Sequence, residues 1–260
     1  MTLRVVKERI NARFNATPIP RDLDTITSVD TANEVSPEQA GLSQREVDAI
    51  WADTIRLYRT GMHPMLSICL RRHGKIVLNR SIGYQRGDAA SDDAVIGDLN
   101  TPICLFSASK AISAMLVHLL DPVSYYIPEF AANGKGYITI YQLLAHRAGV
   151  PGLGADVDSS LLFDREAALA AICAADPIDN SGRTSAYHAI TGGFIIDELI
   201  RRTTGLTVQQ YLDRYIRKPM GMRFFRYGLT RRDLPKAAEN RFTGLPLGPL
   251  APTLKSALGL

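Results

Sequence analysis

Cysteine and histidine are scarce in this 260-residue sequence, which has three cysteines and five histidines. The cysteines, Cys69, Cys104 and Cys173, are odd in number, far apart and without the spacing of a metal site. This pattern argues against a disulfide-based scaffold and favours reduced thiols in a cytoplasmic protein. Because histidine and cysteine form no cluster in the sequence, it indicates neither a metal nor a cofactor.

Long hydrophobic runs and concentrated charge are also missing. No segment is apolar for long enough to span a membrane, and residues 1–9 (MTLRVVKER) lack the apolar core of a signal peptide. The net charge is only +4, and the basic doublets are scattered along the chain, at Arg71-Arg72, Arg201-Arg202 and Arg231-Arg232. We therefore expect no transmembrane segment and no nucleic-acid partner.

What remains is the composition of a globular protein, with 46% hydrophobic and 22% charged residues. A chain of this length can bury a large core in one or two domains. We expect a polar, irregular N-terminal arm over residues 1–42, a main domain over 43–225, and an irregular tail over 226–260.

Sequence patterns at helix ends and turns predict most of the secondary structure. Three capping boxes, in which Ser or Thr is followed three residues later by Glu or Gln, predict helices beginning at Ser43, Thr139 and Thr207. A fourth helix is expected over Phe194–Arg202, with Gly205 as its stop. Two strand-like runs, over residues 65–71 and 76–84, flank a turn and predict a β-hairpin.

The most informative segment is Ser107-Ala108-Ser109-Lys110, at the start of the apolar run Ala111–Leu120. The run predicts a buried helix, in which Ser107 and Lys110 lie one turn apart on the same face. A serine hydroxyl becomes a nucleophile when a neighbouring base takes its proton, and a lysine amine whose pKa is lowered by burial can be that base. The backbone N–H of Ser107, at the helix start, can help hold the oxyanion of an acyl-transfer intermediate.

A Ser-x-x-Lys match alone has a second interpretation, since about one is expected by chance in a chain of this length. Ser107 or Ser109 could cap the helix while Lys110 faces solvent. The segment and its helix leave catalysis and capping both open. The Gly-x-Ser-x-Gly elbow of α/β-hydrolase lipases is absent from the sequence, which argues against that class.

Several segments, in the correct order, resemble the serine β-lactamase-related family, which comprises class C β-lactamases, DD-peptidases, and esterases and lipases of the same fold. They are Ser107–Lys110, Asp121–Pro128, Ile138–Pro151, Gly182–Tyr187 with Gly192–Gly205, and Lys218–Met222. The resemblance runs from about residue 43 to residue 222. It implies an α/β (α+β) fold of the β-lactamase/transpeptidase type, with a helical subdomain and an antiparallel sheet.

The resemblance also implies roles for residues near the nucleophile. Tyr187 stands at the tyrosine of the family's second motif, Tyr-x-Asn, and would relay the proton between Ser107 and the leaving group. Ala189 replaces the asparagine of that motif, which in the family contacts the amide side chain of a β-lactam. This departure favours an ester over a β-lactam as the substrate. We interpret His188 as a bystander rather than a second base.

Two further departures concern missing segments. The step from Leu120 to Asp121 omits a helix end and turn that family members have, and nothing after Tyr187 resembles the last motif, Lys-Thr-Gly or His-x-Gly. The strand that bears this motif supplies a second oxyanion donor and part of the sheet. We therefore expect a family member cut short at its C-terminus, catalytically poor, with an incomplete sheet whose uncovered edge favours a homo-oligomer.

The sequence thus predicts a serine hydrolase that cleaves small carboxylic esters through a Ser107 acyl-enzyme, with Lys110 and Tyr187 as the base and the proton relay. The alternative is a non-catalytic member of the same scaffold that serves as a binding or interaction module. The missing strand favours the alternative, and the intact Ser107, Lys110 and Tyr187 favour the enzyme.

Overall fold

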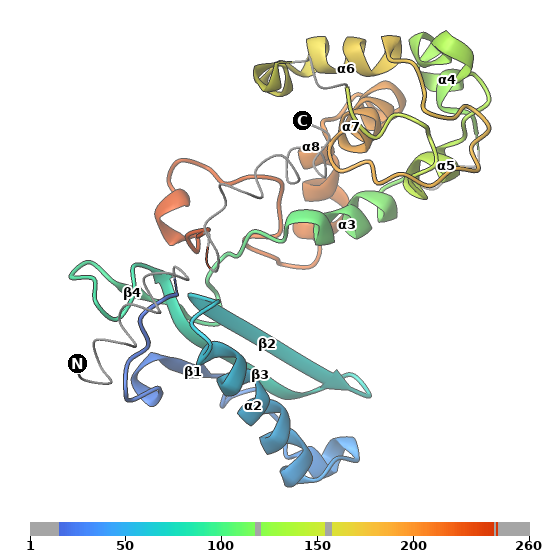
Figure 1. Cartoon of the computed structure of the whole chain (residues 1–260). Helices are drawn as coiled ribbons and strands as arrows, with labels where there is room; N and C mark the ends of the chain where they lie inside the picture. The colour runs from blue at the N-terminus through green and yellow to red at the C-terminus, as the bar shows by residue number, and fades with distance from the viewer. Residues whose placement is uncertain (1–15, 118–120, 154–157, 242, 244–260) are drawn as a thin grey trace. The chain divides into compact units, whose positions relative to one another are not determined.

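The computed structural model describes residues 16–117, 121–153, 158–241 and 243 (Figure 1). These residues form two compact units. The first holds the described residues up to Cys104 together with those from Leu229 onward, and the second holds those from Leu105 to Gly228. This division falls at other residues than the domain boundaries predicted at residues 42 and 225. The predicted boundaries stay a prediction.

An antiparallel sheet of four strands, in the order β1-β3-β2 with β4 beside β3, dominates the first unit. Strands β2 (Met65–Arg72) and β3 (Lys75–Arg86) form the predicted hairpin, with Ser67 opposite Ser81. Strand β1 (Thr27–Val29) pairs with the other side of β3, and β4 (Val95–Ile96) pairs with its C-terminal end.

The described part of the segment before residue 43 is not the extended arm that we expected. It joins the sheet through β1 and forms 3₁₀ turns at Asp24–Ile26 and Pro37–Ala40. Leu23 and Ile26 are buried in a core with Tyr58 and Ile82. The segment is polar on average, and these few apolar side chains are enough to attach it to the sheet.

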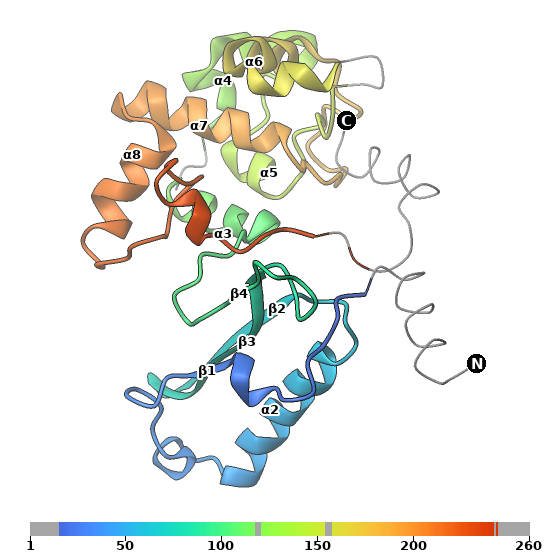
Figure 2. The same ribbon diagram turned by 90° about the vertical axis from the view of Figure 1, so that its left-hand side faces the viewer.

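Helix α2 (Gln44–Tyr58) begins at the first predicted capping box. The Ser43 hydroxyl accepts the N–H of Glu46 at 3.3 Å, and the Glu46 carboxylate accepts the N–H of Ser43 at 2.7 Å. The helix lies against β2 and β3 (Figure 2). The side chain of Tyr58, fully buried, fixes its C-terminal end to the sheet.

Helix α7 (Thr191–Thr204) is the central helix of the second unit. It starts three residues before the predicted helix and ends, as predicted, at Gly205, whose φ is +71°. It packs against α3 (Ser109–Met115), α4 (Val123–Tyr126), α6 (Arg165–Ala174) and α8 (Val208–Leu212). Buried side chains of α7, among them Ile195 and Leu199, form a core with Phe130, Ile140 and Leu143.

The other two capping boxes also start helices. Thr139 caps α5 (Ile140–Leu144) and Thr207 caps α8, which continues into a π-helical turn over Asp213–Arg217. Helix α6 was not predicted, although Asp164 caps it by accepting the N–H groups of Glu166 and Ala167. Further 3₁₀ turns lie at Phe106–Ala108, Pro128–Gly134, Ser159–Phe163 and Leu234–Lys236.

The prediction of a long buried helix from Ser107 onward is wrong. Helix α3 ends at Met115, and none of its residues is buried. The helix is only seven residues long and packs against α7, so it offers its neighbours only a short surface on which apolar side chains could be buried. The part of the prediction that concerns residues 118–120 lies outside the described residues.

Candidate active site

The structure brings the three predicted site residues together within the second unit. Ser107 lies in the 3₁₀ turn that leads into α3, so Lys110 follows one helical turn later. Tyr187 comes from the loop that precedes α7. Its hydroxyl donates a hydrogen bond to Ser107 Oγ at 2.5 Å, across 80 residues of sequence.

Lys110 contacts the same loop at two points. Its Nζ donates a hydrogen bond to the carbonyl oxygen of Ala189 at 2.6 Å and lies 5.1 Å from the centre of the Tyr187 ring. The second distance is within the range of a cation–π contact. Ala189, which has no side-chain amide, thus takes part in the site through its backbone.

The phenol of Tyr187 has a pKa below its ordinary value. Its hydrogen bond with Ser107 lowers the pKa most, burial acts in the opposite direction, and Lys110 lowers it further through a hydrogen bond and its charge. A phenol with a lowered pKa is better able to accept and return a proton near neutral pH. Tyr187 is 47% exposed, so a substrate can reach it.

The two serines of the motif have different surroundings. The hydroxyl of Ser109 donates a hydrogen bond to the carbonyl oxygen of Phe106 at 2.6 Å, whereas that of Ser107 meets Tyr187. Phe106 has a φ of +44°, which is an outlier for a bulky residue. Backbone strain of this kind clusters at functional sites, and here it directly precedes Ser107.

Sequence reasoning missed His146, which touches the residues on both sides of Tyr187. Its carbonyl oxygen accepts the N–H of Ala186 at 2.9 Å, and its Nδ1 accepts the N–H of His188 at 3.2 Å. Its ring meets the Tyr187 ring edge to face, with 4.8 Å between the ring centres. Burial, and then the charge of Lys110, lower the pKa of His146.

His188 is buried, and the hydrogen bonds of its ring are with the backbone. Its Nε2 accepts the N–H of Val150 at 3.1 Å, and its Nδ1 lies 2.6 Å from the carbonyl oxygen of Ala186. Burial lowers its pKa. The hydrogen bond with Val150 joins the loop before α7 to the loop after α5.

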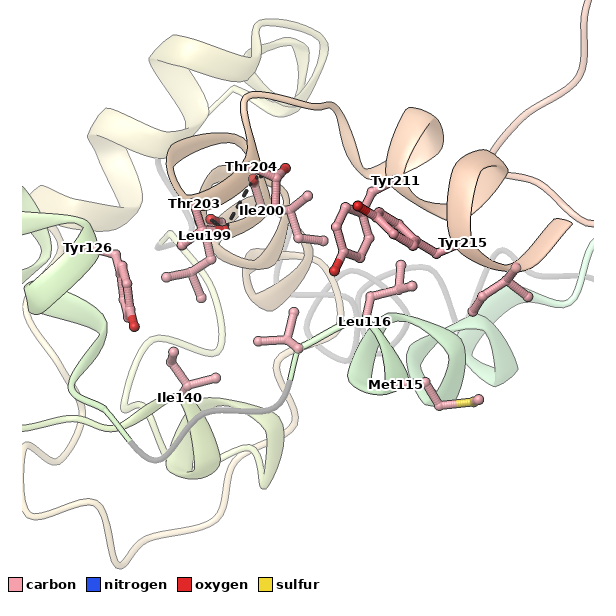
Figure 3. Close-up of a pocket in the computed structure, with 12 residues that line it drawn as sticks. Met115, Leu116, Tyr126, Ile140, Leu199, Ile200, Thr203, Thr204, Tyr211 and Tyr215 are labelled. Carbon is pink, nitrogen blue, oxygen red and sulfur yellow. Dashed lines mark hydrogen bonds between the residues drawn. The ribbon is translucent and has the colours of Figure 1, made fainter. Parts of the chain in front are cut away.

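A separate pocket of about 520 Å³ lies in the same unit (Figure 3). Its lining comes from the C-terminal end of α3, from α4, α5, α7 and the region of α8: Met115, Leu116, Val117, Tyr126, Ile140, Leu199, Ile200, Thr203, Thr204, Tyr211, Tyr215 and Ile216. The predicted site residues do not line this pocket, so it is distinct from the contact between Ser107 and Tyr187.

The described ranges contain neither a candidate metal site nor a candidate membrane span. Within these ranges, no group of three or more His, Cys, Asp or Glu side chains is placed to hold a metal ion. In the same part of the chain, every helix is too short or too polar to cross a membrane.

A serine in contact with a tyrosine, with a lysine one turn along the helix, is an arrangement suited to acyl transfer through a serine nucleophile. The sequence profile of the beta-lactamase family matches residues 54–243. This match spans most of the chain, and the chain belongs to the beta-lactamase family. The family that the sequence predicted is thereby confirmed.

The relatives include esterases and a homologue of penicillin-binding proteins. Esterase/beta-lactamase LipL of Mycobacterium tuberculosis is 32% identical over 140 residues, which are 50% of this chain and 32% of LipL. Among solved structures, a family VIII carboxylesterase is similar with a TM-score of 0.63 and 28% identity, over 72% of this chain and 53% of that one. A penicillin-binding protein homologue from Caulobacter crescentus has a TM-score of 0.65 and 25% identity, over 75% and 53% of the two chains.

These matches confirm the predicted fold class, a mixed α/β fold of the β-lactamase/transpeptidase type with an antiparallel sheet and several helices. The chain spans about a third of LipL and about half of each of the two solved chains.

Proposed function

We propose that this chain carries the nucleophile of a serine ester hydrolase, with Ser107 as the nucleophile and Lys110 with Tyr187 as its proton-transfer pair. The observation that carries the proposal is the 2.5 Å hydrogen bond between the Tyr187 and Ser107 hydroxyls. The names of two relatives, an esterase/beta-lactamase and a carboxylesterase, support it.

In this reaction Ser107 Oγ attacks the carbonyl carbon of the ester while its proton passes to Tyr187 Oη. The positive charge of Lys110 favours the phenolate form of Tyr187 that accepts this proton. The bond between the acyl carbon and the alcohol oxygen breaks, and Tyr187 returns the proton to the leaving alcohol. Water then attacks the Ser107 acyl-enzyme by the reverse proton path and releases the carboxylic acid.

The surroundings of Ala189 favour small carboxylic esters over β-lactams. An alanine side chain offers no amide group to a β-lactam, and the carbonyl oxygen of Ala189 already accepts a hydrogen bond from Lys110. A simple ester places no demand on such a side-chain donor or acceptor.

Comparing hydrolysis of a nitrophenyl butyrate with that of a chromogenic cephalosporin tests the proposal. We expect the chain to turn over the ester faster, and we expect Ser107→Ala to remove that activity. Faster turnover of the cephalosporin would contradict the substrate class. No turnover of either compound above the Ser107→Ala background would support the non-catalytic scaffold instead.

A further inference from the structure

We propose that His146 is a positioning residue, which holds Tyr187 within reach of Ser107. This inference rests on the proposed function, because it gives His146 a task in the proton transfer between these two residues. Among the described residues no hydrogen bond joins His146 to Ser107; His146 contacts the backbone on both sides of Tyr187 and the Tyr187 ring.

The Tyr187 segment needs such support because it has no regular secondary structure of its own. Residues 182–188 form neither helix nor strand, and Tyr187 is half exposed. Helix and sheet hydrogen bonds therefore do not fix its backbone. Side-chain and loop contacts must fix it if the phenol is to keep its short distance to Ser107.

Hydrogen bonds from the loop after α5 supply this support at three points. The carbonyl oxygen of His146 takes the N–H of Ala186, and the ring Nδ1 of His146 takes the N–H of His188. The N–H of Val150 then binds the ring of His188. The residues before and after Tyr187 are thus both held by His146, while its ring packs against the Tyr187 ring.

The geometry requires a neutral His146 with its proton on Nε2, since Nδ1 accepts a hydrogen bond. Burial and the charge of Lys110 favour this neutral form, because both lower the His146 pKa. The backbone is also unusual, with a φ of +60°. Among residues with a side-chain acceptor, histidine and asparagine are enriched at such values.

Three variants at position 146 separate the ring acceptor from the backbone conformation. His146→Gly keeps the positive φ without strain but removes the acceptor. His146→Asn keeps an oxygen acceptor on a side chain that tolerates positive φ. His146→Ala removes the acceptor and strains the backbone. For each variant, kcat and KM for nitrophenyl butyrate are measured together with the rate of labelling by a fluorophosphonate probe.

We expect His146→Gly to lower kcat by up to about 100-fold with KM nearly unchanged, because small displacements of a catalytic group can cost that much. His146→Asn should restore most of this loss. In the Tyr187→Phe background, His146→Gly should cause no further loss, since His146 acts through the Tyr187 hydroxyl. Three results would each overturn the proposal. The first is a His146→Gly variant as active as the wild type, and the second is a His146→Asn variant as slow as His146→Gly. The third is an additive loss in the double variant.

Amide hydrogen exchange in residues 182–190 provides a readout that needs no catalysis. Exchange should be faster in His146→Gly than in the wild type and in His146→Asn. If the wild type has no esterase activity, the proposed function fails. The positioning role is overturned separately if amide hydrogen exchange is equally fast in the wild type and in His146→Gly.

His73→Gly is the matched control. His73 also has a positive φ, +50°, but it is exposed in the β2–β3 turn of the first unit. We expect His73→Gly to leave both readouts unchanged. An equal loss of activity in His73→Gly would show that the position-146 effect comes from general stability, and would overturn the proposal.

Discussion

Lys110 and Tyr187, which are 77 positions apart in the sequence, share one site in the fold: the amine of Lys110 lies 5.1 Å from the centre of the Tyr187 ring. The lysine both lowers the pKa of the phenol and is itself held by the loop that carries it, through the carbonyl oxygen of Ala189. Removing Lys110 therefore takes away part of the interaction that keeps the pKa of Tyr187 low.

This relationship predicts that Lys110 and Tyr187 act as one proton-transfer unit. General acid–base groups contribute about 10²–10⁴-fold to a rate, so Tyr187→Phe and Lys110→Ala should each lower kcat for nitrophenyl butyrate by that factor. The double variant should be little slower than either single variant, because members of one unit are not additive.

Tyr227→Phe is the control for this pair of variants. Ser113 lies on α3, as Lys110 does, and its Oγ is 2.6 Å from the Tyr227 hydroxyl. In the described structure this hydroxyl is not bonded to Ser107, whose partner is Tyr187. We expect Tyr227→Phe to keep near wild-type activity. Losses that multiply in the double variant of Lys110 and Tyr187 would show that the two residues act separately.

We predict that substitution by alanine lowers the unfolding free energy by different amounts at two glycines. Gly149 and Gly205 have similar φ values, +76° and +71°, but a Cβ at Gly149 would lie 2.3 Å from the carbonyl oxygen of Asp179, whereas one at Gly205 would meet open space. Gly205→Ala should cost about 1–2 kcal/mol of unfolding free energy, through the left-handed backbone alone. Gly149→Ala should cost about 1–3 kcal/mol more through the clash. Equal losses in urea unfolding would mean that the loop after α5 adapts freely.

Glu198, on α7, is predicted to stabilise the second unit in a pH-dependent way. Its carboxylate is mostly buried and accepts hydrogen bonds from Arg165 at 2.7 Å and from Arg202 at 2.6 Å. Burial alone would raise its pKa, but Arg202 and Arg165 outweigh burial and hold the pKa below the ordinary value of 4.5. Glu198→Gln should lower the unfolding free energy at pH 7 by about 1–2 kcal/mol.

The pH dependence of this effect has a definite sign. Because the folded pKa of Glu198 is lowered, its stabilisation is complete above about pH 5 and is lost as the pH falls through the folded pKa. The difference between wild type and Glu198→Gln should therefore shrink in acid. Glu166→Gln is the control, since the Glu166 side chain is 86% exposed and should have almost no effect. An equal loss in both variants would contradict the role of Glu198.

The parts of the fold that the sequence predicted well are those determined within a few residues. A capping box is satisfied inside one helical turn, so Ser43, Thr139 and Thr207 predicted the starts of α2, α5 and α8. The hairpin of β2 and β3 followed from two strand-like runs around a short turn. The helix-stop role of Gly205 is equally local, because it depends only on the backbone that glycine can adopt.

Features that depend on distant contacts were predicted poorly or only through resemblance. The apolar run after Lys110 predicted burial of α3, but burial depends on which elements surround the helix. The proximity of Tyr187 to Ser107 came from the family resemblance, since no local rule connects residues 80 positions apart. Nothing in the sequence indicated the contact between His146 and His188, 42 positions away, because that contact arises only when two loops pack together.

The most direct test of the proposed nucleophile is labelling with a fluorophosphonate probe, followed by identification of the modified peptide. We predict a single adduct on Ser107, which Ser107→Ala abolishes. Ser109→Ala should keep the adduct, because the Ser109 hydroxyl is bonded to the carbonyl oxygen of Phe106 rather than to Tyr187. Labelling that persists in Ser107→Ala, or that disappears only in Ser109→Ala, would contradict the assignment of Ser107 as the nucleophile.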